Sequence, residues 1–347
     1  MVAEKERTFV DFLKVVSPGT PLRTVIDDLI RSDLGAIIVF DAPELHEQKM
    51  LDGGFRVNCR FTAQKLFELC KMDGGVVVSQ DLSRIIYANV LMTPDNSLHT
   101  TETGTRHKAA ERTAKQAHTF VIAVSERRKK TTLYYGSSRY YLKSTEELLR
   151  GISSTLQVLE KQREILDDQV NNLSVLEMSE MVSASDVCKV IQRAEMILKI
   201  SESIKRNFTE IGKEGNIMHM RFRELIKGVE KIEGEVLRDY AILSMKRAKT
   251  LLTNITFEGL LELESIARLV LEKPIEESVS PKGFRFLSHL TLSEKEISLI
   301  VKQLESLNGI LSVEPADLEH ILKNRASSIK EEILHLREQV LSGKVVC

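Results

Sequence analysis

The chain has 347 residues, enough for two or three domains that each bury a core of their own. Hydrophobic residues make up 42% and charged residues 29%, and the formal net charge of −1 argues against a protein whose main role is to coat nucleic acid. No stretch approaches 18 uninterrupted apolar residues, the apolar run after the charged N-terminus is too short for a signal peptide, and the four cysteines lack metal-ligand spacing. The sequence therefore predicts a cytoplasmic protein with no membrane partner.

The first 143 residues alternate between strand-like and helix-like segments. Five segments rich in β-branched and aromatic residues are predicted strands, over residues 35–40, 74–79, 84–92, 120–125 and 132–142. Three segments with apolar residues at helical spacing are predicted helices, over residues 20–32, 62–72 and 105–117. Because strands and helices interleave, we expect an α/β domain over residues 1–143, with a mixed sheet flanked by helices.

The character of the sequence changes after Lys143. Ser144 and Glu147 have the spacing of a capping box, and apolar residues then recur at three- and four-residue intervals. Proline is absent from residues 95 to 273, and the apolar repeat is too irregular for a sustained heptad. Residues 144–273 are therefore predicted to form an all-α domain with one long spine helix. Further amphipathic runs lie at about 185–209, 219–250 and 256–272.

The composition of residues 274–285 is typical of a linker, and residues 286–347 are predicted to form a small unit of short helices. Residues 292–296 and 314–318 have the sequence of helix starts. Residues 307–311 are predicted to end a helix, with Gly309 at or near the cap.

Residues 103–116 carry the strongest local signal for a binding site. A turn containing Gly104 is followed by Thr105, Arg106, His107 and Lys108, which we expect in the first turn of a helix. Free backbone N–H groups and a partial positive charge at a helix start favour an anion, and the added hydroxyls and cations suit a polyphosphate. The alternative is an ordinary solvated basic face of a helix.

A second candidate lies at Asp73 and Gly74, between a predicted helix and a predicted strand. An aspartate beside glycines can hold a divalent metal or accept a proton from a sugar hydroxyl. The alternative is a plain Asp-Gly turn. Together with the cationic helix start, this carboxylate gives what a nucleotidyl transfer site needs.

These motifs resemble those of a known family. Met72-Asp73-Gly74-Gly75, Ile86-Tyr87-Ala88-Asn89, Glu102-Thr103-Gly104-Thr105-Arg106-His107-Lys108, Glu111-Arg112 and Ser125-Glu126-Arg127-Arg128 are similar to the pattern of a diadenylate cyclase domain. The order of three regions resembles the DNA integrity scanning (DisA) family, in which this domain precedes a helical spine and a helix-hairpin-helix domain. The resemblance implies condensation of two ATP molecules into cyclic di-AMP with release of two pyrophosphates, in a homo-octamer linked to DNA scanning.

The resemblance also implies roles for individual residues. Asp73 would be catalytic, binding Mg²⁺ or Mn²⁺ and helping to activate the 3′-hydroxyl, with Arg106 and His107 as further catalytic residues. The implied nucleotide contacts are Gly74 against the nucleotide, the backbone of Met92 at adenine, the phosphate cradle of Thr105, Arg106, His107, Lys108 and Ala109, and Ser125 and Arg128 in the pocket.

Three positions depart from the family pattern. Gly75 stands where the family has alanine, Lys108 where it has arginine, and Ala109 where it has threonine. Lysine lacks the planar fork that binds phosphate bidentately, and Ala109 removes a hydroxyl. We therefore expect a slow cyclase. One alternative is a degenerate member that binds ATP or cyclic di-AMP without turnover, and another is a purely structural helical oligomer.

The C-terminal region departs further. A helix-hairpin-helix offers backbone N–H groups of a Gly-x-Gly hairpin to a DNA phosphate, whereas residues 318–326 contain no glycine and predict a shorter, degenerate hairpin. Residues 286–347 carry seven Lys/Arg against nine Asp/Glu. DNA as a partner is therefore a weaker expectation than ATP.

Overall fold

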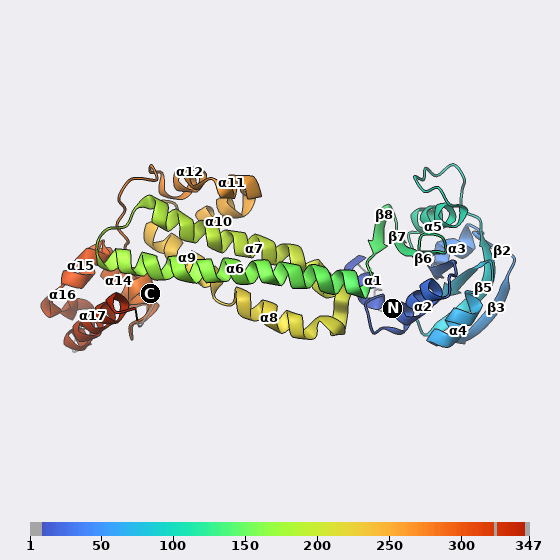
Figure 1. Ribbon diagram of the computed structural model, residues 1–347, viewed down its shortest axis with the longest axis horizontal. Helices are drawn as coiled ribbons and strands as arrows, with labels where there is room; N and C mark the ends of the chain where they lie inside the picture. Colours follow the sequence, from blue (N-terminus) through green and yellow to red (C-terminus); the bar gives the residue numbers. More distant parts are fainter. Residues whose placement is uncertain (1–8, 323–324, 344–347) are drawn as a thin grey trace. The chain divides into compact units, whose positions relative to one another are not determined.

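The computed structural model describes residues 9–322 and 325–343, drawn in Figure 1. The chain forms two compact units. The first runs to Ile152 and also contains Lys205–Ile217 near the end of a long helix. The second contains Ser153–Ile204 and the chain from Met218 onward, so the C-terminal helices group with most of the spine.

The first unit is built on a mixed sheet of eight strands. The strands are β1 Ala36–Phe40, β2 Leu51–Asp52, β3 Phe55–Arg60, β4 Gly75–Val78, β5 Arg84–Met92, β6 Phe120–Ser125, β7 Lys130–Tyr135 and β8 Ser138–Leu142. Their order is β2-β5-β4-β1-β6-β7-β8, with β3 also paired to β5. In the described part of the chain, β1 and β4 pair in parallel and the other strand pairs of the sheet are antiparallel. The predicted α/β class and mixed sheet are confirmed.

Helices cover both faces of this sheet. They are α1 Phe9–Val15, α2 Pro21–Arg31, α3 Pro43–Glu47, α4 Ala63–Leu69 and α5 Thr105–Gln116. Alternate residues of β1 enter different cores, because Ile38 packs in a cluster with residues of α1, α2 and α4, whereas Val39 packs in a cluster with residues of α3 and α5. A strand buried on both faces reads as a continuous apolar run, as residues 36–40 do.

One predicted strand is wrong in extent. Residues 132–142 form a hairpin of β7 and β8 rather than a single strand, because Gly136 turns the chain with a φ of 51°. The register pairs Tyr134 with Arg139 and Leu133 with Tyr140.

The all-α region begins with α6, a helix of 34 residues from Thr145 to Met178. The predicted capping box is confirmed, since the Glu147 N–H donates to Ser144 Oγ (3.1 Å) and the Ser144 N–H donates to the Glu147 carboxylate (3.0 Å). The helices that follow are α7 Ala184–Ile211, α8 Asn216–Ile226, α9 Val229–Tyr240, α10 Met245–Asn254, α11 Phe257–Leu261 and α12 Leu263–Ile266, with a 3₁₀ turn at Gly212–Gly215 and a π-helical turn at Ala267–Leu271.

In the described residues, helices α13 to α17 follow at the C-terminal end. They are α13 Phe284–Leu287, α14 Glu294–Leu304, α15 Leu307–Ser312, α16 Pro315–Leu322 and α17 Ala326–Leu341. They pack around an apolar cluster that includes Ile310 and Ile333 and also Met178, the last residue of α6. Among the described residues, no helix is both long and apolar enough to cross a membrane.

The structure corrects one expectation in this region. Residues 307–311 start a helix rather than end one, because Ser306 is the N-cap of α15 and accepts a hydrogen bond from the Gly309 N–H (3.2 Å). The predicted starts of α14 and α16 are confirmed. The degenerate hairpin predicted within 318–326 includes residues 323 and 324, which lie outside the described residues.

Candidate nucleotide-binding site

Several predicted site residues meet at one edge of the sheet because of its topology. β1 and β4 are parallel and neighbouring, so Gly35 and Gly74, which precede them, lie at the same edge. β6 runs antiparallel to β1 and ends there at Ser125, and β5 runs antiparallel to β4 and ends there at Met92. Strands lie about 4.8 Å apart, so roughly 10 Å separates the start of β4 from the end of β6. This edge therefore gathers Asp73, Gly74, Met92 and Ser125.

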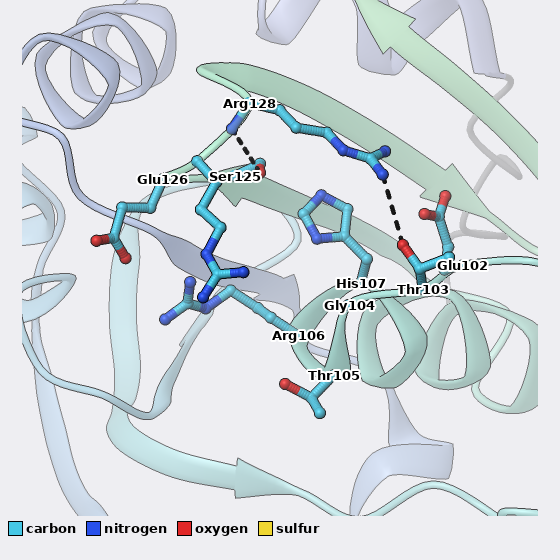
Figure 2. A pocket seen from close by; sticks show the side chains of 10 residues that line it. Glu102, Thr103, Gly104, Thr105, Arg106, His107, Ser125, Glu126 and Arg128 are labelled. Carbon is cyan, nitrogen blue, oxygen red and sulfur yellow. Dashed lines mark hydrogen bonds between the residues drawn. The ribbon is translucent and has the colours of Figure 1, made fainter.

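A cavity of ≈ 530 Å³ opens at this edge, shown in Figure 2. Its lining comes from two segments, the start of α5 and the turn between β6 and β7. The lining residues are Glu102, Thr103, Gly104, Thr105, Arg106, His107, Ser125, Glu126, Arg127 and Arg128. The cavity thus combines a helix N-terminus with three arginines.

The start of α5 offers free backbone donors to the cavity. Gly104 is the N-cap, and among the described residues no side chain caps this end of the helix. The first intrahelical bond runs from the Lys108 N–H to the Gly104 carbonyl (2.9 Å). The N–H groups of residues 105–107, in the first turn of α5, therefore have no partner within the helix. An anion at this position would satisfy these donors.

Arg106 is placed by a close contact with Gly35. A Cβ atom at Gly35 would lie 1.9 Å from Arg106 Nη1, so the guanidinium occupies the space that any other residue at position 35 would fill. Within the described part of the chain, Arg106 forms no hydrogen bond or ion pair, which leaves its donors available to a ligand.

The other cations of the cavity are held from the β6–β7 turn and from α5. The Arg128 N–H donates to Ser125 Oγ (3.3 Å), and its guanidinium reaches Thr103 Oγ1 (3.5 Å), as Figure 2 shows. Partial burial holds the pKa of His107 below its usual value of 6.5; Glu102 opposes this effect, while Arg106 and Arg128 add to it. His107 is therefore neutral at pH 7 when no anion is bound.

Glu102 is a buried carboxylate in the wall of this cationic cavity. One of its oxygens, Oε1, accepts hydrogen bonds from the Tyr134 hydroxyl (2.9 Å) and from Arg139 Nη1 (3.0 Å). Its negative charge is thus balanced from β7 and β8, and a polyphosphate would meet mainly the arginines.

The loop of residues 93–104, which leads to the cavity, is fastened to α5 by side chains of that helix. Arg112 donates to the carbonyls of Leu98 (2.9 Å) and Asn96 (2.8 Å), and Lys115 donates to the carbonyl of His99 (2.8 Å). The Thr100 hydroxyl donates to the Glu111 carboxylate (2.5 Å). A loop without regular structure is therefore ordered by the helix whose N-terminus it delivers.

Gly74 is explained by packing against β5. A Cβ atom at Gly74 would lie 2.3 Å from the backbone carbon of Asn89, and the Gly74 N–H donates to Asn89 Oδ1 (3.1 Å). Asn89 has a left-handed φ of 55° where the pairing of β4 and β5 shifts register. The exposed Asp73 is held next to this bulge.

Asp73 is suited to a metal that also binds the phosphate oxygens of a ligand. Among the described residues, no group of three or more His, Cys, Asp or Glu side chains could enclose a metal ion. Asp73 forms no hydrogen bond or ion pair with the part of the chain that the structure describes. Mg²⁺ is commonly bound by one or two carboxylates together with phosphate oxygens, and a single open carboxylate fits that pattern.

Half of the predicted site residues line the cavity, and the others do not. Those outside its lining are Asp73, Gly74, Met92, Lys108 and Ala109. Ala109 packs against the core cluster under α5 that contains Val39. Sequence reasoning missed Gly35 and Arg139 as parts of the site. A glycine at a strand start was the available signal for Gly35, whereas no local pattern links Arg139 to Glu102, 37 residues away.

The fold and cavity define a nucleotide-binding domain, and comparison with known families supports this class. Residues 23–139 match the family described as DisA bacterial checkpoint controller nucleotide-binding, and residues 142–274 match the DisA bacterial checkpoint controller linker region. The chain is 35% identical over 355 residues to the DNA integrity scanning protein DisA of Clostridium botulinum (strain Loch Maree), covering 99% of this chain and 100% of the relative. The proteins of the same name from Acetivibrio thermocellus and Clostridium kluyveri are 34% and 36% identical; the alignments cover 97% and 98% of this chain and 96% and 99% of the relatives.

The chain therefore belongs to the DisA family. Among solved structures, DacA from Staphylococcus aureus is 18% identical to this chain, covers 39% of this chain and 91% of that chain, and has a TM-score of 0.32.

Proposed function

We propose that this protein is a diadenylate cyclase that condenses two ATP molecules into cyclic di-AMP and releases two pyrophosphates. The observation that carries the proposal is the cavity of three arginines and a free helix N-terminus at the same sheet edge as Asp73. In this reaction each 3′-hydroxyl attacks the α-phosphate of the other ATP, so two copies of this edge must face each other. The octamer implied by the family resemblance is part of the proposal, and light scattering tests it.

In the proposed reaction, positively charged groups bind the phosphates and a negatively charged group accepts the proton. Arg106, Arg128 and the N–H groups of α5 bind the triphosphate and stabilise the pyrophosphate that leaves. The open carboxylate of Asp73 accepts the proton of the 3′-hydroxyl of a bound nucleotide. Mg²⁺ or Mn²⁺, held by Asp73 and phosphate oxygens, would neutralise phosphate charge when bound. The reaction is proposed to occur in the cytoplasm.

The test is incubation of purified protein with ATP and either metal, followed by chromatography for cyclic di-AMP. Asp73→Asn is expected to abolish the product while leaving thermal unfolding unchanged, because Asp73 is exposed. Asp28→Asn, a partly exposed carboxylate of α2, is the matched control and should keep full activity. Absence of product from the unaltered protein with both metals would rule out the cyclase.

The second candidate is a family member that binds ATP or cyclic di-AMP without turnover. Lys108 and Ala109 favour it, because neither supplies a donor to the cavity. Nucleotide binding by calorimetry with no product, in the unaltered protein, would select this candidate.

Recognition of DNA structure by the C-terminal helices is a separate proposal, drawn from the names of the relatives. Residues 286–347 carry more acids than bases, so binding to branched DNA should be weak and strongly reduced by salt. Fluorescence anisotropy at two salt concentrations tests it.

A further inference from the structure

β8 is an edge strand whose two faces make different polar contacts. On one face, Arg139 lies opposite Tyr134 of β7, and both donate to the same Glu102 oxygen. Glu102 stands two residues before Gly104, the N-cap of α5. This face of β8 therefore fixes the wall of the nucleotide cavity.

The opposite face of β8 is held by the end of α7. The Tyr140 hydroxyl donates to Glu210 Oε2 (2.5 Å), and Glu210 is completely buried. The rings of Phe9 and Tyr140 are 5.9 Å apart, and the Arg206 guanidinium lies 5.8 Å from the Tyr140 ring. Since successive side chains of a strand alternate, Arg139 and Tyr140 connect the two faces through adjacent residues.

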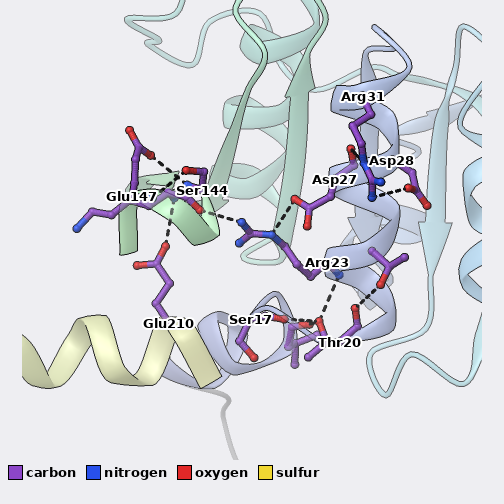
Figure 3. Close-up of polar contacts among 12 residues, drawn as sticks. Ser17, Thr20, Arg23, Asp27, Asp28, Arg31, Ser144, Glu147 and Glu210 are labelled. Carbon is purple, nitrogen blue, oxygen red and sulfur yellow. Dashed lines mark hydrogen bonds and ion pairs between the residues drawn. The ribbon is translucent and has the colours of Figure 1, made fainter. Parts of the chain in front are cut away.

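The junction after β8 is clamped by two charged side chains of opposite sign. Glu210 Oε1 accepts from the Lys143 N–H (3.2 Å), and Arg23 Nη2 donates to the Lys143 carbonyl (3.0 Å). Figure 3 shows Arg23 and Glu210 reaching this junction from different helices, beside Ser144 where α6 begins. Arg23 is itself buried and paired with Asp27 (2.9 Å). Both backbone groups of Lys143 are thus bound, so β8 has little freedom to shift.

We propose that Glu210 is a positioning residue for nucleotide binding, which holds β8 from the side of α7 so that Arg139 holds Glu102 and the cavity wall. The proposal rests on the proposed function in one respect, since an ATP analogue is the probe in its test. Glu210 lies near the end of α7, in the part of that helix that belongs to the same compact unit as the cavity.

A double-mutant cycle tests whether Glu210 affects nucleotide binding through Arg139. Affinity for the non-hydrolysable analogue α,β-methylene-ATP is measured by calorimetry for Glu210→Gln, Arg139→Leu and the combined variant. Glu210→Gln is expected to weaken binding about fivefold alone and to have no further effect when Arg139 is already replaced. Residues without shared partners normally show independent effects, so fold-changes that multiply would overturn the proposal.

Tyr140→Phe keeps the ring and removes only the hydroxyl that contacts Glu210. This variant tests the same contact if Glu210→Gln does not fold. Tyr141→Phe is the matched control on the same strand, because its ring faces the Arg139 guanidinium (5.2 Å) on an exposed face. Tyr140→Phe should weaken analogue binding, and Tyr141→Phe should leave it unchanged. Equal affinities for the two variants would overturn the proposal.

Hydrogen exchange without nucleotide separates this proposal from the proposed function. Glu210→Gln should speed exchange of the amides of residues 102–107, and Tyr141→Phe should not. Faster exchange in a protein that binds no ATP analogue would support the positioning role and contradict the cyclase. Unchanged exchange and unchanged affinity in a protein that binds the analogue would contradict the positioning role alone.

Discussion

At the scale of single residues, Gly35 determines where the Arg106 guanidinium can lie. Gly35→Ala places a Cβ atom in the space of Nη1, so the flexible end of Arg106 must move out of the cavity. We expect ATP affinity to fall about tenfold, the order of one charged hydrogen bond, with little loss of stability. Calorimetry measures the affinity. The control is Gly151→Ala, because nothing lies within 4 Å of the Cβ atom added there. Unchanged affinity would mean that Arg106 does not contact the ligand.

The lowered pKa of His107 predicts proton uptake on ATP binding. The imidazole is neutral at pH 7 in the free protein, and a bound triphosphate favours its charged form. Because binding takes up a proton, the affinity for ATP should rise as the pH falls from 8 toward 6. Calorimetry in two buffers of different ionisation enthalpy measures the uptake, and His107→Asn should remove it. Equal uptake in that variant would assign the proton to another group.

Gly75 and Met92 are matched in size. A Cβ atom at Gly75 would lie 3.0 Å from Met92 Cε, so Gly75→Ala should cost about 1 kcal/mol by overpacking. Adding Met92→Leu shortens the side chain and should restore stability in urea unfolding. If the double variant is as unstable as the single one, the strain lies elsewhere, for instance at the Val90 carbonyl, 3.5 Å from the same Cβ position.

The candidate site was predictable where its residues are neighbours in sequence. The start of α5 from Gly104 to His107 follows from local chemistry, whereas the segment of Ser125 and Arg128 was predicted from the family resemblance alone. Contacts between distant segments, such as the Arg106 side chain of α5 against Gly35 before β1, depend on strand order, which the sequence pattern alone does not give. At Ala109 a prediction from neighbouring residues differs from the structure. Its place in the motif indicates a phosphate contact, but its side chain packs against the core.

At the scale of elements, α7 and α9 share a buried pair of carboxyl groups. Burial, followed by the hydrogen bond and charge of Glu195, raises the pKa of Glu233 from 4.5 to about 8. The folded protein therefore keeps a proton that the unfolded chain releases, and stability is lost as the pH rises from about 4.5 to about 8.

Glu233→Gln should remove this pH dependence, because an amide can donate to Glu195 as the protonated acid does. We expect a melting temperature above that of the unaltered protein at pH 8 and close to it at pH 5. Glu224→Gln, an exposed carboxylate on α8, is the control. Equal pH profiles for the unaltered protein and Glu233→Gln would place the proton elsewhere.

Elements were predictable in proportion to how fully they are buried. β5 and β6 have the bounds read from their apolar residues, whereas β3 (Phe55–Arg60) was missed because most of its residues are exposed and its pattern is polar. The segment 219–250 reads as one amphipathic run, but Gly228, with a φ of 79°, separates α8 from α9. Short polar strands and helix breaks are set by tertiary contacts that periodicity does not record.

At the scale of the whole molecule, the second unit is tied together by Arg285. This residue of α13 is buried and pairs with Glu177 of α6 (2.5 Å). Asp239 of α9 accepts the backbone N–H groups of Gly283 (2.8 Å) and Arg285 (3.0 Å). The same network therefore joins three helices from distant parts of the sequence.

Glu177→Ala leaves the Arg285 charge buried without its partner and should destabilise the second unit by about 3–5 kcal/mol. Replacing both residues, as Glu177→Leu with Arg285→Met, should recover most of the loss. Calorimetric unfolding with and without ATP distinguishes the units, since ATP should raise only the transition of the unit that contains the cavity. A loss that ATP compensates would contradict this assignment.

The contribution of α6 to the C-terminal core has a consequence for how this region can change in evolution. Met178 belongs to the apolar cluster of the last five helices, and Glu177 is neutralised by one of them. Deleting those helices would leave an apolar side chain and an unpaired acid at the end of the spine. The exposed residues of this region can therefore change by substitution, while selection for a folded spine retains its helices.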